Sequence, residues 1–238
     1  MNPVKQRADE LLKEFQSNFG LEVVDATQGS DDWFNLKLGV ISASNASKAV
    51  AKKGSATRDT YMCELISQVM SGQMKDISAA PLDWGRSLED AARASYEFPR
   101  NTKIIELPFV FKDNSFRCGA SPDGIVSEKR GIEIKCPYAS ENHVKFLLSD
   151  KIKPEYVWQI QYTMWVLGLE EYDFCSYDPR MSNHLLKSLT VEKDPKAHEK
   201  MDELIPDFIK EMDHHLENLG IKFGDHWKAK AKKLGNAV

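Results

Sequence analysis

The stretch that decides the fold is Ser121-Pro122-Asp123-Gly124, followed after a short interval by Glu133-Ile134-Lys135. Residues 124–127 are Gly-Ile-Val-Ser, and residues 128–131 are Glu-Lys-Arg-Gly. A charged run that ends in glycine is typical of a tight turn between antiparallel strands. We therefore predict a hairpin with strands over 124–127 and 131–135.

Alternation along the second strand gathers reactive groups on one side of this hairpin. Successive side chains of a strand point to opposite faces, so Glu133 and Lys135 point the same way, about 6.6 Å apart. Ile132 and Ile134 point the other way, into a core. Because the hairpin returns Asp123 to the side of Glu133, two carboxylates and one ammonium group are expected to converge at one edge of a sheet.

These three groups suit metal-dependent cleavage of a phosphodiester. A pair of carboxylates holds a hard divalent cation through oxygen, and a lysine beside that cation orients or deprotonates the attacking water. A strand with one charged face is also common without any metal, and Pro-Asp-Gly is an ordinary turn. The motif predicts a nuclease site, and an ordinary charged strand stays open as the alternative.

Length and composition indicate a water-soluble globular protein. The chain has 238 residues, of which 42% are hydrophobic and 29% charged, as in ordinary globular domains. Because no linker or repeat interrupts it, we expect a single domain over 1–238. No apolar run is long enough to span a membrane, and the N-terminus lacks the apolar core of a secretory signal, so we expect a cytoplasmic protein.

Charge and cysteine content exclude two classes of protein. The net charge is −4 and the pI about 5.9, which argues against a protein that coats nucleic acid. An enzyme with a basic channel on an acidic body stays open. Four scattered cysteines are too few for a disulfide framework or a zinc site.

Hydrophobic periodicity predicts a mixed α/β architecture with a sheet between helices. Helices are predicted over 3–17, 31–38, 44–52, 57–70, 82–98, 141–148, 154–167 and 199–219. Strands are predicted over 103–111, 116–120, 124–127, 131–135, 172–177 and 185–191.

Three polar residues on predicted helices have two interpretations each. Glu89 is more often a solvated helix residue than a metal ligand. Gln159 and Gln161 lie on a helix that is apolar around most of its circumference, so we expect them to be buried and in need of partners. Either amide could orient a catalytic lysine or contact a phosphate, and either could instead be satisfied by backbone in the core.

Several basic residues are candidates for contact with DNA. Ser44 could cap a helix whose N-terminus binds phosphate, with Lys37 adding charge, although a capped surface helix without ligand is the default. Lys52, Lys53 and the tail over about 228–238 are either solvated or in contact with the DNA backbone.

Further stretches match, in the same order, the motifs of a known family. They are Gln28-Gly29, Asp32-Trp33, residues 38–44 (Leu-Gly-Val-Ile-Ser-Ala-Ser), Trp84-Gly85 with Glu89, residues 121–124, residues 133–137 (Glu-Ile-Lys-Cys-Pro), residues 159–162 with Met164-Trp165, residues 177–181 (Tyr-Asp-Pro-Arg-Met), and Phe223-Gly224. On these motifs the chain resembles, over nearly its whole length, the YqaJ-type viral recombinase family of lambda-type phage exonucleases. That family lies within the restriction-endonuclease-like PD-(D/E)xK nucleases, which implies an α/β fold with a central mixed β-sheet flanked by helices.

The resemblance implies a processive 5′-to-3′ exonuclease on linear double-stranded DNA. Such an enzyme prefers 5′-phosphorylated ends, releases mononucleotides and leaves a 3′ single strand. It implies two Mg²⁺ ions as cofactor, with Mn²⁺ as a substitute. It also implies a ring-shaped homotrimer, a phage single-strand annealing protein as partner, no membrane, and a phage- or prophage-encoded protein in the bacterial cytoplasm.

The same resemblance assigns roles at the hairpin and nearby. Asp123 and Glu133 correspond to the metal carboxylates, and the backbone carbonyl of Ile134 completes the metal shell. Lys135 activates the water, and Glu89 supports the metal region.

Other roles carried over by resemblance concern the DNA. Gln159 supports the active site, and Leu82 wedges the end of the duplex open. Lys37, Ser44 and Ser121 form a pocket for the terminal 5′-phosphate.

The chain departs from the family at three places. Lys37 stands where the family has an arginine, and lysine is a flexible point charge that cannot grip a phosphate bidentately. The loop near Lys52 and Lys53 is shorter, and the basic tail continues beyond Trp227.

Three other functions fit the same residues. A site-specific or structure-specific endonuclease on this fold would cut closed circles, whereas an exonuclease needs an end. A non-catalytic DNA-binding or scaffold module would carry a decayed site, against which the complete Asp-Glu-Lys set argues. A repair nuclease would act on single strands.

Overall fold

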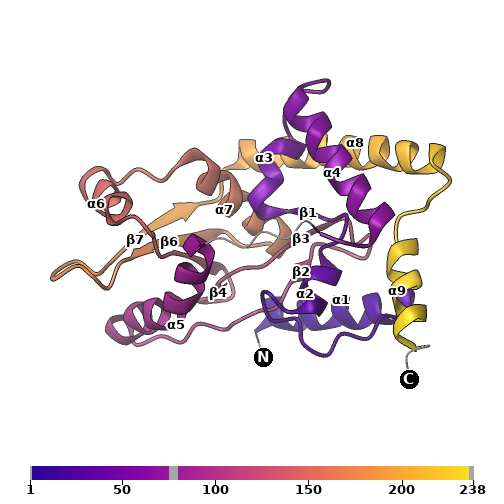
Figure 1. The fold of residues 1–238 in the computed structure, drawn as a ribbon. Coiled ribbons are helices and arrows are strands. Elements are labelled where there is room, and N and C mark those ends of the chain that lie inside the picture. The colour runs from indigo at the N-terminus through magenta and orange to yellow at the C-terminus, as the bar shows by residue number, and fades with distance from the viewer. Residues whose placement is uncertain (1, 75–79, 236–238) are drawn as a thin grey trace.

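The computed structural model describes residues 2–74 and 80–235 and shows a mixed α/β fold (Figure 1). Its helices are α1 (Pro3–Phe19), α2 (Asp31–Leu36), the 3-10 helix η1 (Ala43–Asn45), α3 (Ala46–Ala49), α4 (Ala56–Ser71), α5 (Ala80–Arg100), α6 (Ser140–Ser149), α7 (Pro154–Leu167), α8 (Pro195–Asn218) and α9 (Asp225–Gly235). Its strands are β1 (Ile41–Ser42), β2 (Val110–Phe111), β3 (Cys118–Ala120), β4 (Gly124–Ile125), β5 (Arg130–Lys135), β6 (Glu171–Tyr177) and β7 (Leu186–Glu192). In Figure 1, α8 crosses the upper side and α1 the lower side, with strands between them.

Within the described residues, the strands form two mixed sheets. The first has the order β1-β3-β2, with β1 parallel to β3 and β2 antiparallel to it. The second has the order β4-β5-β6-β7, in which β5 and β6 are parallel and the other pairs antiparallel. The chain crosses from the first sheet to the second at residues 121–123, between the end of β3 and the start of β4. The Ser-Pro-Asp motif is therefore the junction between the sheets.

Gly124 fixes the geometry of this junction. Its φ is +155°, a region that side chains disfavour. A Cβ at this position would lie 2.1 Å from Cγ2 of Ile104. Glycine alone allows β4 to start here, opposite Ile132 of β5.

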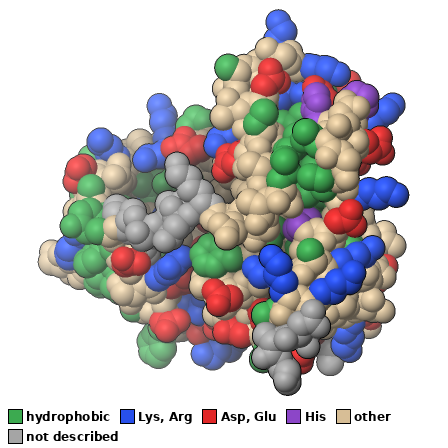
Figure 2. Space-filling model, turned by 45° about the vertical axis from the view of Figure 1, so that its right-hand side comes forward, with side chains coloured by type: hydrophobic (Ala, Val, Ile, Leu, Met, Phe, Trp, Pro, Cys, Tyr) green, Lys and Arg blue, Asp and Glu red, His purple; other side chains and the backbone are tan. Residues whose placement is uncertain are grey.

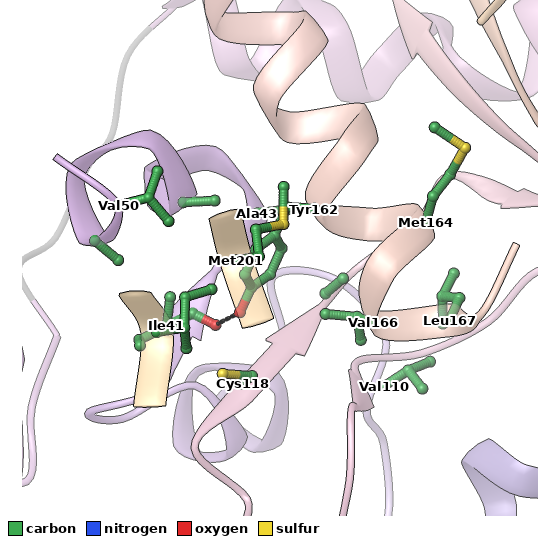
Figure 3. Close-up of a cluster of buried hydrophobic side chains, with 14 of the residues drawn as sticks. Ile41, Ala43, Val50, Val110, Cys118, Tyr162, Met164, Val166, Leu167 and Met201 are labelled. Atoms are coloured by element: carbon green, nitrogen blue, oxygen red, sulfur yellow. Dashed lines mark hydrogen bonds between the residues drawn. The ribbon is translucent and has the colours of Figure 1, made fainter. Parts of the chain in front are cut away.

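Helix α7 forms the centre of the core. It begins at Pro154, whose fixed φ suits a first helical turn, and ends at Gly168 with φ +73°. Its buried side chains pack on β1 and β3, and the Tyr162 hydroxyl donates to the carbonyl oxygen of Ile41 at 2.7 Å (Figure 3). This packing fixes the helix that carries Gln159.

The predicted fold class is confirmed, and the helix over 154–167 has the predicted bounds. The predicted strand over 103–111 is wrong for most of its length, since only Val110 and Phe111 pair as β2 and Ile105 makes a single bridge to Ile125. Pro108 lies in the middle of that stretch and has no N–H to donate to a neighbouring strand.

One other prediction is wrong. Instead of one helix over 44–52, the chain forms the short helices η1 and α3, which end at Ala49. The basic tail is helical up to Gly235 as part of α9, which is anchored by the fully buried Trp227, and Lys228, Lys232 and Lys233 are exposed. That residues 1–238 form one domain stays a prediction. Of the helices in residues 2–74 and 80–235, none is both long and apolar enough to cross a membrane.

Candidate active site

The hairpin of β4 and β5 brings Asp123 and Glu133 together as the sequence predicts. Gly124 pairs with Ile132, so Asp123 and Glu133 occupy the next position along the two strands. The Asp123 Oδ2 atom accepts a hydrogen bond of 2.6 Å from the backbone N–H of Ile134. Ile132 is fully buried on the opposite face, which confirms the predicted alternation.

Lys135 and Gln159 both bind the carboxylate of Glu133. The Lys135 Nζ atom lies 2.5 Å from Glu133 Oε1, and Gln159 Nε2 donates to the same oxygen at 2.7 Å. Gln159 Oε1 in turn lies 3.5 Å from Lys135 Nζ. Glu133 is only 2% exposed, so these are charge-assisted bonds in a largely dry environment.

The two glutamines of α7 have different tasks. Gln159 closes the triangle with Glu133 and Lys135. Gln161 instead binds backbone on both sides of its amide, donating to the carbonyl oxygen of Glu192 at 2.8 Å and accepting from the N–H of Asp194 at 2.9 Å. Gln161 is therefore the satisfied core amide, and Gln159 belongs to the site.

Electrostatics couple these groups. Burial, the neighbouring Glu133 charge and Glu89 raise the pKa of Asp123 well above its usual range, against the opposing effect of Lys135. Burial alone would lower the pKa of Lys135, but Glu133 and Asp123 raise it above the ordinary value. Lys135 is therefore an ammonium group at neutral pH.

Strand geometry places the carbonyl of Ile134 on the edge of β5 that faces Asp123. The N–H and C=O of one strand residue point to the same side of the strand. Because the N–H of Ile134 donates to Asp123, its carbonyl oxygen lies on that same edge of β5. The pairing of β4 with β5 ends at Ile132. Beyond it, the side chain of Asp123 takes the place of a paired strand beside Ile134.

Glu89 lies on α5 and is engaged elsewhere. Its Oε1 atom accepts from Arg93 Nη2 at 2.8 Å. Burial raises the pKa of Glu89, and Arg93 opposes this effect. The charge of Glu89 nevertheless acts on Asp123, so Glu89 faces the site without joining it.

The donor set fits a hard divalent cation in part. Each carboxylate binds its described partners through one oxygen, Oδ2 of Asp123 and Oε1 of Glu133. The second oxygen of each carboxylate and the carbonyl oxygen of Ile134 are ligands of the type that Mg²⁺ takes. In residues 2–74 and 80–235, however, no three Asp, Glu, His or Cys side chains form a ready-made metal cluster.

A second cluster forms around Trp33 of α2. Its indole Nε1–H donates to the Ser121 hydroxyl at 2.8 Å, and the Lys37 ammonium lies 3.6 Å from the centre of its ring. Burial lowers the pKa of Lys37 to about 8. Two of the three predicted phosphate residues are thus brought together by a tryptophan that sequence reasoning missed.

Ser44 is in a different setting from the one predicted. It is exposed, it lies inside η1, and it caps no helix. The expected cap is wrong because the chain makes a 3-10 turn there. Ser44 still follows β1, whose residue Ser42 pairs with Gly119 of β3, so Ser44 and Ser121 leave neighbouring parallel strands.

The remaining DNA candidates are at the surface or undescribed. Lys52 and Lys53 are exposed, and Lys53 lies 3.4 Å from Glu211 Oε2. The side chain of Leu82 lies outside the described part of the structure.

Tyr156 is a further residue that sequence reasoning missed. Its ring centre lies 4.9 Å from the Lys135 Nζ atom. Tyr156 precedes Gln159 by three residues on α7, so helical spacing placed both on one face and was the available signal. Trp33 stands in the family-matching stretch Asp32-Trp33, but its contact with Ser121 spans 88 residues and had no local signal.

The comparisons with known proteins identify the family of the chain. A model of the YqaJ-like viral recombinase domain matches residues 32–170, more than half of the chain. The alkaline exonuclease LHK-Exo from Laribacter hongkongensis, also solved with dAMP, is 32% identical with a TM-score of 0.73 over 86% of this chain and 100% of that chain. An uncharacterized Escherichia coli (strain K12) protein, ExoD, is 38% identical over 87 residues, which are 36% of this chain and 100% of ExoD.

A more distant structure shows the fold alone. It is a phage-related exonuclease from Haemophilus somnus 129PT, 14% identical with a TM-score of 0.58 over 76% of this chain and 96% of that chain. Family match, structural likeness and site geometry lead to one conclusion: the chain belongs to the YqaJ-like viral recombinase domain family.

Proposed function

We propose that this protein is a DNA exonuclease that degrades linear double-stranded DNA from 5′ to 3′. The observation that carries the proposal is the convergence of Asp123, Glu133 and Lys135 on the β4–β5 hairpin, closed by Gln159. The likeness to an alkaline exonuclease over most of the chain supports it. The products would be mononucleotides and a 3′ single strand.

Each side chain of the site has a separate task. Asp123, Glu133 and the Ile134 carbonyl would hold Mg²⁺, in one or two ions with Mn²⁺ as substitute, which supplies an activated water and neutralises charge on the phosphate. Lys135, kept protonated by its carboxylate neighbours, donates hydrogen bonds to the attacking water or a phosphate oxygen. Gln159 fixes the side chains of Glu133 and Lys135 relative to each other through hydrogen bonds. Glu89 adds negative charge beside the site.

The cluster at Trp33 suits the terminal 5′-phosphate. The indole N–H is only a donor, so Ser121 must accept it, which leaves the Ser121 proton free to donate to an anion. The Lys37 ammonium is fixed nearby on the indole face. Ser44 offers a second hydroxyl from the adjacent strand end.

Processivity and assembly follow from the family resemblance. A homotrimeric ring would retain DNA by enclosure, with Lys52, Lys53 and Leu82 as contacts to the duplex. The 3′ strand would pass to a phage single-strand annealing protein. We place this activity in the bacterial cytoplasm.

Digestion of matched substrates tests the activity. With Mg²⁺, the protein should degrade a linear 5′-phosphorylated duplex, degrade a 5′-hydroxyl duplex more slowly, and leave closed circles intact. Lys135→Ala should lower kcat by about 10²- to 10⁴-fold and leave the fold and DNA binding intact.

Lys187→Ala is the matched control. Its side chain is 25% exposed, close to the 27% of Lys135, and it lies two strands away on β7, where it pairs with Asp150. Cleavage of closed circles would favour an endonuclease. Full digestion by Lys135→Ala would end the proposal.

A further inference from the structure

The segment that follows Lys135 is held rigidly by one arginine. Arg180 donates to the carbonyl oxygens of Pro137 at 2.9 Å and Tyr138 at 3.0 Å. It also makes a bidentate pair with Asp178, at 2.8 and 2.9 Å. Asp178 is 1% exposed, and Arg180 holds its pKa at about 2 despite the opposing effect of burial. The backbone of residues 137–138 is therefore fixed to the end of β6.

Trp84 of α5 completes this brace. The Arg180 guanidinium lies 4.6 Å from the centre of the Trp84 ring. The Tyr138 ring meets Trp84 edge to face, with centroids 6.1 Å apart and planes at 89°. An arginine stacked on tryptophan and a perpendicular tyrosine form a preferred aromatic geometry. Tyr138 is thus held through its carbonyl and through its ring.

Despite this brace, the Tyr138 side chain is 56% exposed. It lies three residues beyond Lys135, within about 10 Å along an extended chain. The Trp84 contact leaves more than half of the Tyr138 surface open to solvent, three residues from Lys135 in the chain.

We propose that Tyr138 is a stacking platform for a nucleobase of the DNA at the active site. This inference rests on the proposed function, because it needs a DNA end at Lys135. A rigid aromatic ring stacks on any base, since every base has a π face, and it loses little conformational freedom on binding. Arg180 is the positioning residue, because it contacts the platform and not the DNA.

Binding measured without cleavage tests the platform. In a Lys135→Ala background, blunt duplexes carry the fluorescent adenine analogue 2-aminopurine at the first or second position of either strand. With Tyr138 present, one of these positions should show quenched fluorescence on binding. Tyr138→Ala and Tyr138→Leu should relieve the quenching and weaken binding by about 5- to 150-fold, whereas Tyr138→Trp should retain both.

Phe98→Ala is the matched control, because Phe98 is 91% exposed at the far end of α5. In the otherwise wild-type enzyme, Tyr138→Leu should raise KM and change kcat by less than about twofold, since stacking acts on binding. Tyr138→Leu with the affinity and fluorescence of Phe98→Ala would overturn the platform. Quenching without digestion by the wild type would overturn only the exonuclease, and absence of DNA binding would overturn both.

Discussion

The ionised carboxylate of Asp123 is unfavourable in the folded protein, yet the proposed metal site needs it. Burial and Glu133 oppose its ionisation, so its carboxylate destabilises the native state at neutral pH. When folding raises the pKa of a carboxyl group, the free energy of unfolding falls as the pH rises above the pKa of that group in the unfolded chain. Such conflict is expected where a protein keeps like charges together for a cation.

Asp123→Asn should therefore stabilise the protein while abolishing digestion. The amide can still accept from the Ile134 N–H, and it removes the charge. Without divalent cations we expect a melting temperature higher by a few degrees, about 2–4 °C per kcal/mol for a chain of this size. Added Mg²⁺ should raise the melting temperature of the wild type more than that of the variant. A variant that melts below the wild type would contradict this account.

Lys37 should make recognition of the 5′-phosphate dependent on pH. Burial lowers its pKa to about 8, so the charge is present below pH 8 and is lost above it. The ratio of kcat/KM for 5′-phosphorylated over 5′-hydroxyl ends should fall as pH rises from 7 to 9.5. Lys37→Arg should keep the ratio flat, because arginine stays protonated. The same slope in both proteins would exclude Lys37 from the pocket.

The residues that sequence could predict are those related by short-range geometry. Glu133 and Lys135 follow from strand alternation, and Asp123 follows from a hairpin. Trp33 could not be predicted, since its bond to Ser121 depends on how α2 meets the end of β3. The engagement of Glu89 by Arg93 is an i,i+4 pair on one helix, a short-range signal that was available in the sequence.

At the scale of elements, local signals set helix ends well and strand extents poorly. Proline and glycine mark both ends of α7. The stretch over 103–111 was predicted as one strand, but a strand also needs a partner along its length. Here only Ile105 and the last two residues are paired, and Pro108 between them has no N–H to donate.

Helix α9 combines exposed lysines with an anchor in the core. Trp227 is fully buried among Phe15, Phe19 and Phe111, and its indole N–H donates to the Asn35 carbonyl oxygen at 2.7 Å. Lys230 binds the side chain of Asn35.

Trp227→Ala should destabilise the protein by about 3–5 kcal/mol, the usual range for a buried aromatic. Urea denaturation measures this free energy of unfolding. Lys233→Ala, at an exposed position of α9, is the control and should change it by less than about 0.5 kcal/mol. Equal stability of the two variants would mean that α9 does not anchor the fold.

At the scale of the whole molecule, charge is mixed and not uniformly basic. The net charge is −4, and Figure 2 shows Lys and Arg interspersed with Asp and Glu on the face in view. Strong electrostatic adhesion to DNA is not expected from such a surface. Retention of DNA by a ring would remove the need for it.

A ring can be tested by its mass and by its response to salt. In solution the native mass should be three times that of the 27.0-kDa chain. Between 50 and 200 mM salt, loading onto ends should weaken, whereas the nucleotides released per loading event should change by less than about twofold. A mass of one chain, or a release length that falls with loading, would refute enclosure.

The placement of the two clusters in the chain has a consequence for biosynthesis. The catalytic hairpin spans only residues 123–135, and a β-hairpin forms within about 1–10 μs. The tryptophan–serine bond joins residues 88 apart, and such long-range contacts form later. The three charged groups are therefore close together in the chain, whereas the pocket expected to bind the DNA terminus depends on a contact between distant segments.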